Sequence, residues 1–500
     1  MLRSKKMRFS FRRYHIIFGL SVLVIVNLVI YFVQHQRAQA SKAGNKSREL
    51  DYRIKLFRPF KRESQRKANS QIKTKKRNLI YGGNYTLKHT PVNFNNLTLE
   101  KLSEVFKQRE QLGALEHSRA GKLCKNALQS SVWVDKDEIK KVQLQLIEER
   151  ISDGEFVTLT SNCSKFLSRH GYTNIPLRKV EEDFPIAFAI IMYRSAAQVE
   201  QLLRTIYRPH NYYCIHVDKK AYDAVRVAME SIAACFDNVF IVPSAVKITW
   251  CSIEVLHAEQ LCMNLLLERG HNWKYYINLA GQDFPLKTNF EIVQILKLFE
   301  GKNDVASFQD DRHVSRQQYA FRQVNDKLEA SNILKAPPPD NITISKGELH
   351  VSLSRGFVDF VLKSEIAKIL YDWLRDTECP DEHFYQTLNR LPGTPGGFTH
   401  NAMTISRAKI WNKANTCHGK TIRGVCVFGA GDLPWLIKQP HLFANKFNID
   451  RDPLPTYCLE RYLKEKSRYP RPINLNVYRQ FVFKRLIDSN TMKWTAAGTL

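Results

Sequence analysis

The chain has 500 residues, of which 44% are hydrophobic and 11% aromatic, and this composition is typical of a globular protein with a sizeable core. Its 76 Lys and Arg outnumber its 48 Asp and Glu, which gives a net charge of +28, and residues 1–120 alone hold 26 Lys and Arg against 7 Asp and Glu. Because the positive charge is concentrated in this tail and not interleaved with aromatic residues on a folded face, the composition excludes a nucleic-acid coat protein.

The first predicted element is a membrane anchor. Residues 16–33 are apolar and uncharged, and their number is about the minimum for a helix that crosses a bilayer. Six basic residues precede them, so the positive-inside bias places residues 1–15 in the cytosol, residues 16–34 in the membrane and the rest in a lumen. A cleaved signal peptide is the alternative, but the apolar run is longer than a usual signal and no clean cleavage site follows. The sequence therefore predicts a single-pass type II membrane protein.

Residues 35–120 are rich in Lys, Arg, Gln and Asn and lack apolar periodicity. This composition predicts a flexible luminal stem, which separates a catalytic domain at residues 121–500 from the membrane.

Ten cysteines are spread through the part after the anchor, and none shows the Cys-X-X-Cys spacing of a zinc site. In an oxidising compartment such cysteines indicate disulfides. Asn-X-Ser/Thr sequons, each a candidate for N-glycosylation, agree with luminal exposure; they begin at Asn45, Asn84, Asn96, Asn162 and Asn341. Chance occurrence accounts for some sequons.

Short apolar runs alternate with amphipathic stretches from about residue 184. The runs at 188–193, 212–218, 238–243 and 275–279 predict buried strands, and the stretches at 198–207 and 252–267 predict helices. This alternation predicts an α/β fold, with a mostly parallel sheet flanked by helices on both faces.

Ligands of such sheets bind outside the carboxyl ends of the strands. We therefore expect Tyr193, Asp218, Trp250 and Asp283 around one crevice, where an acid can bind a sugar hydroxyl and an aromatic ring can stack on a base or sugar. Taken singly, an Asp at a strand end is often a helix cap and a Trp is often part of the core. Their positions at successive strand ends favour a binding site.

Six motifs lie in order between Cys124 and Cys458, at residues 184–193, 213–218, 235–240, 273–289, 380–382 and 423–447. Together they resemble the core 2 β-1,6-N-acetylglucosaminyltransferase family of Golgi enzymes. That family includes the I-branching enzymes and has peptide O-xylosyltransferases as distant relatives. The resemblance implies a GT-A (Rossmann-like) fold, an inverting Leloir reaction, a UDP-sugar donor and a mucin-type O-glycan acceptor.

The resemblance also implies roles for individual residues. Glu382 matches the catalytic base, while Asp381 beside it fits a helix-capping role. Arg423 and Lys446 match a pair of cations that stabilises the departing diphosphate, so no metal cofactor is expected. The donor contacts carried over from the family are Ile191, Met192, Tyr193, Asp218, Lys219, Lys220 and Trp250.

Metal-dependent GT-A enzymes hold Mn²⁺ with an Asp-X-Asp motif at a strand end. This chain has such motifs at residues 135–137 and 450–452, but the first precedes the predicted sheet and the second lies beyond its nucleotide-binding strands. We therefore expect neither motif to bind a metal at the site.

Acceptor contacts carry over less well. Arg316 and Trp411 match acceptor residues next to gaps, and the position of an acceptor-binding glutamate holds Ala306. The resemblance further implies the disulfides Cys163–Cys235, Cys214–Cys262, Cys417–Cys426 and Cys124–Cys458. Cys251 and Cys379 have no counterpart in the family; they are either free or joined in a fifth bridge.

The glycine-rich residues 428–431 resemble a phosphate-binding loop, but a lone Gly-X-Gly that does not follow the first strand is a weak signal. We expect these residues to shape a turn, tied by Cys417–Cys426, that presents Arg423 to the diphosphate.

The sequence thus predicts a Golgi membrane enzyme that transfers N-acetylglucosamine from UDP-GlcNAc in β-1,6 linkage to core 1 O-glycans on glycoproteins. Its predicted partners are the donor, the glycan acceptor and the Golgi membrane, with homo-oligomerisation left open. Two alternatives stay open as well. One is an I-branching-like or xylosyltransferase-like specificity, and the other is a catalytically silent, glycan-binding membrane protein.

Overall fold

The computed structural model describes residues 120–129, 135–173, 175–309, 314–397, 404–411 and 416–479. All of them belong to one compact unit, Asn93–Leu500. The predicted cytoplasmic tail, the transmembrane anchor and nearly all of the stem lie outside the described residues, as do the sequons at Asn45, Asn84 and Asn96. In the part of the chain that is described, no helix is long and apolar enough to span a membrane.

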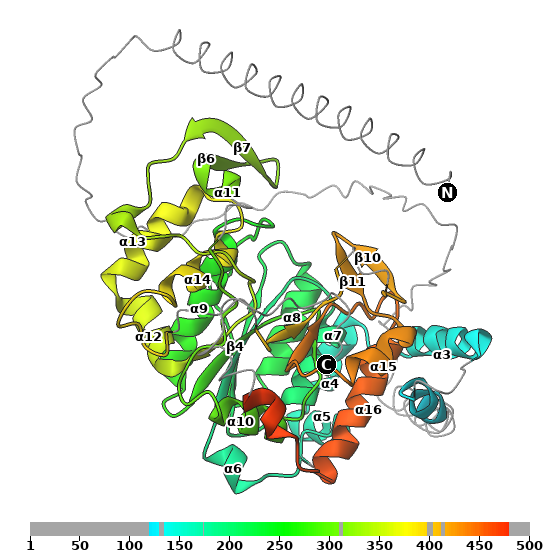
Figure 1. The fold of residues 1–500 in the computed structure, drawn as a ribbon. Coiled ribbons are helices and arrows are strands. Elements are labelled where there is room, and N and C mark those ends of the chain that lie inside the picture. The colour runs from blue at the N-terminus through cyan, green and yellow to red at the C-terminus, as the bar shows by residue number, and fades with distance from the viewer. Residues whose placement is uncertain are drawn as a thin grey trace, which may run out of the picture. The chain divides into compact units, whose positions relative to one another are not determined.

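A five-stranded sheet forms the centre of the unit (Figure 1). Its strands are β1 (Ile186–Met192), β2 (Tyr212–Val217), β3 (Val239–Ile241), β4 (Tyr275–Ala280) and β8 (Ser352–Ser354). They lie in the order β3-β2-β1-β4-β8; the first four are parallel, and β8 is antiparallel to β4. The four predicted strands are confirmed, and with them the α/β class with a mostly parallel sheet.

Helices cover both faces of this sheet because its strands are apolar on both sides. Along β1, Phe188 and Ile190 face one core cluster, which is completed by α7 (Ala196–Ile206), α8 (Asp223–Ala233) and α10 (Asn289–Lys297). Ala187 and Ala189 face the opposite cluster. There the covering helices are α9 (Glu254–Arg269), α12 (Arg355–Lys363), α13 (Glu365–Trp373) and α14 (Phe384–Leu388). The result is the three-layer arrangement that Figure 1 shows.

The remaining helices are short or lie at the edges of the unit. Before the sheet come α3 (Lys136–Glu148), α4 (Asp153–Leu159), α5 (Cys163–Arg169) and α6 (Lys179–Glu182). Later in the chain follow α11 (Ser315–Gln318), α15 (Leu433–Leu436) and α16 (Leu454–Arg468). Single 3₁₀ turns are η3 (Pro339–Asn341), η4 (Leu374–Asp376), η5 (Pro380–Glu382) and η7 (Ala430–Asp432).

Three smaller sheets complete the fold and carry much of the candidate site. One has the order β5-β12-β9, with β5 (Asp283–Pro285), β12 (Phe443–Asn445) and β9 (Arg407–Ala408). The others are the hairpins β6 (Tyr319–Val324) with β7 (Lys327–Leu334), and β10 (Lys420–Ile422) with β11 (Val425–Val427). A third apolar cluster joins β5, β12 and α16, so the C-terminal part packs as one block against the sheet domain.

All ten cysteines form disulfides, and the four predicted pairs are confirmed. The pair that the sequence left open, Cys251 and Cys379, forms a fifth bridge. Cys124–Cys458 joins the start of the described chain to α16 across 334 residues. The other predicted pairs are Cys163–Cys235, Cys214–Cys262 and Cys417–Cys426.

We predict that replacing both Cys124 and Cys458 by Ala lowers the free energy of unfolding by about 5 kcal/mol, because the bridge closes a very long loop. Replacing Cys417 and Cys426, which are 9 residues apart, is expected to cost about half as much in the same loop-entropy model. Urea unfolding of the two double variants measures both losses. Equal losses would contradict the entropic explanation.

Candidate active site

The ends of β1 and β2 form one wall of the candidate site. The amide of Asp218 donates a hydrogen bond to the carbonyl of Met192 (2.8 Å). The buried carboxylate of Asp218 accepts hydrogen bonds from the amides of Lys220 (2.9 Å) and Ile248 (3.3 Å), and it pairs with the Lys220 ammonium group. Tyr193 is 40% exposed, and the Lys220 ammonium group lies 5.1 Å from its ring centroid. The guanidinium carbon of Arg194 lies 4.4 Å from the same centroid. Asp218 therefore organises this edge, at which Tyr193 and Lys220 are both exposed.

The loop after β3 connects this wall to Trp250. The Lys220 ammonium group donates a hydrogen bond to the carbonyl of Ile248 (2.6 Å), two residues before the tryptophan. Trp250 is 64% exposed. Of the other predicted donor contacts, Ile191 is partly buried at the end of β1, and Lys219 is exposed beside Lys220. The structure thus brings the predicted donor residues of three segments to one edge of the sheet.

The two predicted diphosphate ligands meet at the same edge. Arg423 and Gly424 form the two-residue loop of the β10–β11 hairpin, and both have the positive φ values that a type I′ turn requires, 52° and 77°. The guanidinium carbon of Arg423 lies 5.6 Å from the centroid of the Trp250 ring. Lys446, directly after β12, donates a hydrogen bond from its ammonium group to the carbonyl of Ile422 (3.0 Å).

Arg423 and Lys446 are like charges held close together. Burial, together with the positive charge of Arg423, lowers the pKa of Lys446. A bound anion between the two side chains would relieve this repulsion and gain two charge-assisted hydrogen bonds. The arrangement is therefore suited to a diphosphate.

The prediction for residues 428–431 was wrong about which glycine makes the turn. Gly424, and not Gly429 or Gly431, completes the turn that presents Arg423. The amide of Gly429 donates to the carboxylate of Asp432 (2.8 Å), and the amide of Ala430 donates to that of Asp452 (3.1 Å). These amides are already satisfied, which agrees with the interpretation that the segment is not a phosphate cradle.

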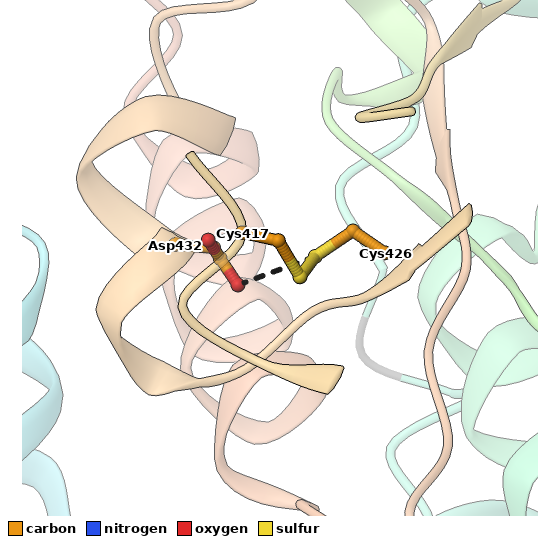
Figure 2. Close-up of side chains that lie close together, drawn as sticks. All are labelled: Cys417, Cys426 and Asp432. Carbon is orange, nitrogen blue, oxygen red and sulfur yellow. Dashed lines mark hydrogen bonds between the residues drawn. A yellow bond between two sulfur atoms is a disulfide. The ribbon is translucent and has the colours of Figure 1, made fainter. Parts of the chain in front are cut away.

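Figure 2 shows the only described group of Cys, His, Asp or Glu side chains that is close enough to suggest a metal site. Cys417 and Cys426 are bonded to each other, and the Cys426 sulfur lies 3.9 Å from a carboxylate oxygen of Asp432. Because metals bind cysteine as thiolate, the oxidised pair supplies no thiolate ligand. The cluster instead braces the hairpin that carries Arg423, as the sequence predicted for the disulfide.

The two Asp-X-Asp motifs have structural roles. Asp135 caps the N-terminus of α3 through the amide of Asp137 (3.0 Å). Asp450 pairs with Arg150, and Asp452 binds the amide of Leu454 at the start of α16 (3.0 Å).

Glu382 ends the turn η5 and lies between two cations. Its carboxylate is 2.6 Å from Arg316 and 3.3 Å from Lys346. The backbone of Glu382 is fixed as well, because its carbonyl accepts a hydrogen bond from the amide of Gly347 (2.8 Å). Arg316, predicted to bind the acceptor, thus lies beside the predicted base. Lys346 was missed, and no signal in the sequence connects it to a residue 36 positions away.

Asp381 does not cap a helix as its position suggested, since η5 has no side-chain cap. Its side chain is buried, and one carboxylate oxygen has no hydrogen-bond partner among the described residues. Burial, with a further contribution from the charge of Glu382, raises the pKa of Asp381 to about 8. Burial also raises the pKa of Glu259 to about 7, although its carboxylate accepts hydrogen bonds from Tyr385 and Asn278, both at 2.7 Å. Two carboxyl groups with raised pKa values therefore lie under the turn.

Asp283 is not in the crevice where we expected it. It is buried on β5, and its carboxylate forms an ion pair with the fully buried Arg407 (3.0 Å) and accepts a hydrogen bond from Asn445 (2.7 Å). Because Asn445 directly precedes Lys446, Asp283 supports the strand that carries this cation. Its position at a strand end does not reveal a partner 124 residues later in the chain.

The remaining acceptor candidates differ in exposure. Trp411 is half exposed and bridges to Val425 of β11, so it lies beside the turn of Arg423. Ala306 is buried and offers no polar side chain. Gly347 is required opposite it, because a Cβ atom there would lie 1.8 Å from the Ala306 carbonyl oxygen.

The carboxyl edge of a parallel sheet that gathers exposed aromatic rings, two cations and an adjacent carboxylate has the features of a nucleotide-sugar transferase site. The model of the Core-2/I-branching enzyme family matches residues 186–437. A human β-1,3-galactosyl-O-glycosyl-glycoprotein β-1,6-N-acetylglucosaminyltransferase is 34% identical over 400 residues, which cover 75% of this chain and 92% of the relative.

Human and mouse N-acetyllactosaminide β-1,6-N-acetylglucosaminyl-transferases are 38% and 40% identical over 317 residues, which cover 61% of this chain and 79% of each relative. The chain therefore belongs to the Core-2/I-branching enzyme family. It is a glycosyltransferase of the β-1,6-N-acetylglucosaminyltransferase class.

The raised pKa of Asp381 predicts a pH-dependent stability. In the folded protein the group stays protonated up to about pH 8, whereas in the unfolded chain it ionises near its ordinary pKa of 3.8. The folded state then binds more protons between these values, so stability falls as the pH rises. Asp381→Asn should remove up to about 1.4 kcal/mol per pH unit of this slope.

The measurement is the free energy of unfolding in urea at several pH values from 5 to 8, with the disulfides intact. Asp237→Asn, which makes the same exchange at an exposed position, is the matched control. An Asp381→Asn variant with the slope of the wild type would contradict the protonated state of Asp381.

Proposed function

We propose that the protein transfers N-acetylglucosamine from UDP-GlcNAc, with inversion, in β-1,6 linkage to the GalNAc of core 1 mucin-type O-glycans, on a GT-A fold. The observation that carries this proposal is the meeting of Arg423, Lys446 and Trp250 at one edge of the sheet in a member of this family. The printed activity of the human relative supports the linkage and the glycoprotein acceptor.

In the proposed reaction, Glu382 removes the proton from the acceptor hydroxyl as its oxygen attacks the anomeric carbon. The bond from this carbon to the diphosphate oxygen breaks in the same step, and UDP departs. Arg423 binds phosphate oxygens with its planar guanidinium group, and Lys446 adds a compact charge. These two cations stabilise the charge that develops on the leaving group, so the reaction needs no metal cofactor.

Uridine and ribose would lie along the wall formed by β1 and β2. Tyr193 and Trp250 supply exposed rings for stacking. Ile191 and residues 218–220 would line the nucleoside, whereas the side chain of Met192, also a predicted donor contact, is buried in the core. On the acceptor side, Arg316 lies next to Glu382, and Trp411 lies next to the turn of Arg423.

We also propose that the enzyme is a single-pass type II protein of the Golgi membrane with its catalytic domain in the lumen. Five disulfides support an oxidising compartment. The described sequons support luminal exposure too, because both Asn162 and Asn341 are exposed. The anchor itself rests on the sequence of residues 16–34.

N-acetyllactosamine is a second possible class of acceptor. The two N-acetyllactosaminide β-1,6-N-acetylglucosaminyl-transferases are 38% and 40% identical to this chain, whereas three O-glycan enzymes of human and mouse are 34%, 35% and 37% identical. In addition, Ala306 offers no carboxylate to an acceptor sugar. An I-branching-like enzyme, which acts on N-acetyllactosamine, is therefore the alternative.

The test is UDP release by the full-length protein in EDTA, with several UDP-sugars as donors and with core 1 disaccharide or N-acetyllactosamine as acceptors. We expect UDP-GlcNAc with core 1 to give the fastest release, and EDTA to leave the rate unchanged. Faster transfer to N-acetyllactosamine would favour the alternative. Loss of activity in EDTA would contradict the metal-free mechanism. If no pair of donor and acceptor gave UDP release, the enzyme proposal would be wrong and a glycan-binding protein would be favoured.

Replacing Glu382 by Gln tests the base. The amide keeps the size of the side chain but accepts no proton, so we expect kcat to fall by at least about 100-fold. UDP affinity should stay within a factor of a few, because Glu382 acts on the acceptor. Calorimetry of UDP binding beside the rate assay separates these effects, and a variant that keeps its rate or loses UDP binding would reassign the residue.

A further inference from the structure

The fifth disulfide joins the two halves of the site. Cys251 directly follows Trp250 and precedes α9, whereas Cys379 lies three residues before Glu382. The two cysteines are 128 residues apart in the sequence. The bridge therefore connects the donor side of the site to the turn that carries the proposed base.

Backbone hydrogen bonds run beside the bridge and continue from it to Glu382. The amide of Cys379 donates to the carbonyl of Cys251 (2.8 Å), and the amide of Glu382 donates to the carbonyl of Cys379 (2.9 Å). On the donor side, Trp250 lies under the guanidinium group of Arg423. A short path of contacts thus runs from the diphosphate cation to the base.

Both cysteines adopt a backbone conformation that L-residues rarely adopt. Their φ values are 64° at Cys251 and 51° at Cys379, and their side chains are 7% and 2% exposed. Such conformations persist where the surroundings fix them, and they are frequent at functional sites. The chain turns sharply directly after Trp250 and directly before η5, so the direction of both segments depends on these two residues.

The fold does not depend on this bridge alone to hold the two segments together. Glu259 on α9 accepts a hydrogen bond from Tyr385 on α14, deeper in the core (2.7 Å). Leu256 and Phe384 of the same two helices also belong to one apolar cluster. Removing the bridge should therefore loosen the surface segments that carry Trp250 and Glu382, while the helices beneath stay packed.

We infer that the Cys251–Cys379 disulfide is a positioning element of the transfer reaction, which sets the distance between the donor at Trp250 and the base at Glu382. This role rests on the proposed function. A displacement reaction needs the base, the acceptor hydroxyl and the anomeric carbon in a narrow geometry, and a misplacement of about 1 Å can cost on the order of 100-fold in rate. The bridge acts through Trp250 and Glu382 and does not itself contact the substrate.

The experiment compares two double variants of the full-length protein, Cys251→Ala with Cys379→Ala and Cys163→Ala with Cys235→Ala. The control bridge, Cys163–Cys235, closes a loop of 72 residues and lies on α5, outside the site. Loop entropy depends on the logarithm of the loop length, so both variants should lose similar stability. The rate of transfer from the wild type's preferred UDP-sugar and the affinity for UDP are measured for both.

We expect the Cys251/Cys379 variant to lose at least ~10-fold in kcat. Its UDP affinity should fall less than its kcat does, because only the stacking of Trp250 is loosened while Arg423 and Lys446, which bind the diphosphate, lie on a separate segment. The control variant should keep the kcat of the wild type. An unchanged kcat in the Cys251/Cys379 variant, or an equal fall in the control, would overturn the positioning role.

A second variant keeps the test decisive if the alanine pair does not fold. Glycine adopts positive φ without steric cost, so Cys251→Gly with Cys379→Gly removes the bridge and also relieves the backbone at both positions. The same fall in kcat is expected. A wild type that transfers no sugar would contradict the proposed function itself, whereas an active wild type with equally active bridge variants would contradict only the positioning role.

Discussion

The site depends on the enforced proximity of two positive side chains, Arg423 and Lys446. Neither is held by an acidic side chain in the described structure; the backbone geometry of the hairpin turn and of β12 brings them together. Burial, and to a smaller extent the charge of Arg423, lowers the pKa of Lys446, so keeping both side chains charged here has an electrostatic cost. An anionic ligand offsets that cost, and a diphosphate leaving group becomes more anionic as it departs. Relief of the repulsion between the two cations therefore adds to the stabilisation of the leaving group as it departs.

Contacts in the surrounding structure hold the segments that carry these cations. The buried pair of Asp283 and Arg407 links β5 to β9, and Asp283 also binds Asn445 next to Lys446. Burial lowers the pKa of Arg407, and the carboxylate of Asp283 opposes this effect. On the other side, Cys417–Cys426 and Asp432 brace the hairpin of Arg423. A buried ion pair and a disulfide therefore fix the two cations from different directions.

The sequence predicted the central sheet well because each parallel strand is a continuous apolar run. It missed β8, whose three residues, Ser352–Ser354, are mostly polar and join the sheet by pairing with β4. It placed Asp283 in the crevice because the local pattern of a strand end is the same whether its acid faces solvent or a buried arginine. The turn of Arg423 was assigned to the wrong glycine, since Gly424, Gly429 and Gly431 lie close together in the sequence. The partners of Glu382 and the pairing of Cys251 with Cys379 depend on contacts between distant segments, which one sequence does not reveal.

The most direct test of this account is the affinity of the protein for UDP and for uridine in EDTA, measured by calorimetry with the wild type and with a variant carrying both Arg423→Ala and Lys446→Ala. If the two cations bind the diphosphate, the wild type should bind UDP at least about tenfold more tightly than uridine without any metal, because each charge-assisted hydrogen bond contributes on the order of 1.5–3 kcal/mol. The double variant should lose this difference while its affinity for uridine stays the same. A preference for UDP that survives in the double variant, or that requires a divalent cation in the wild type, would contradict the account.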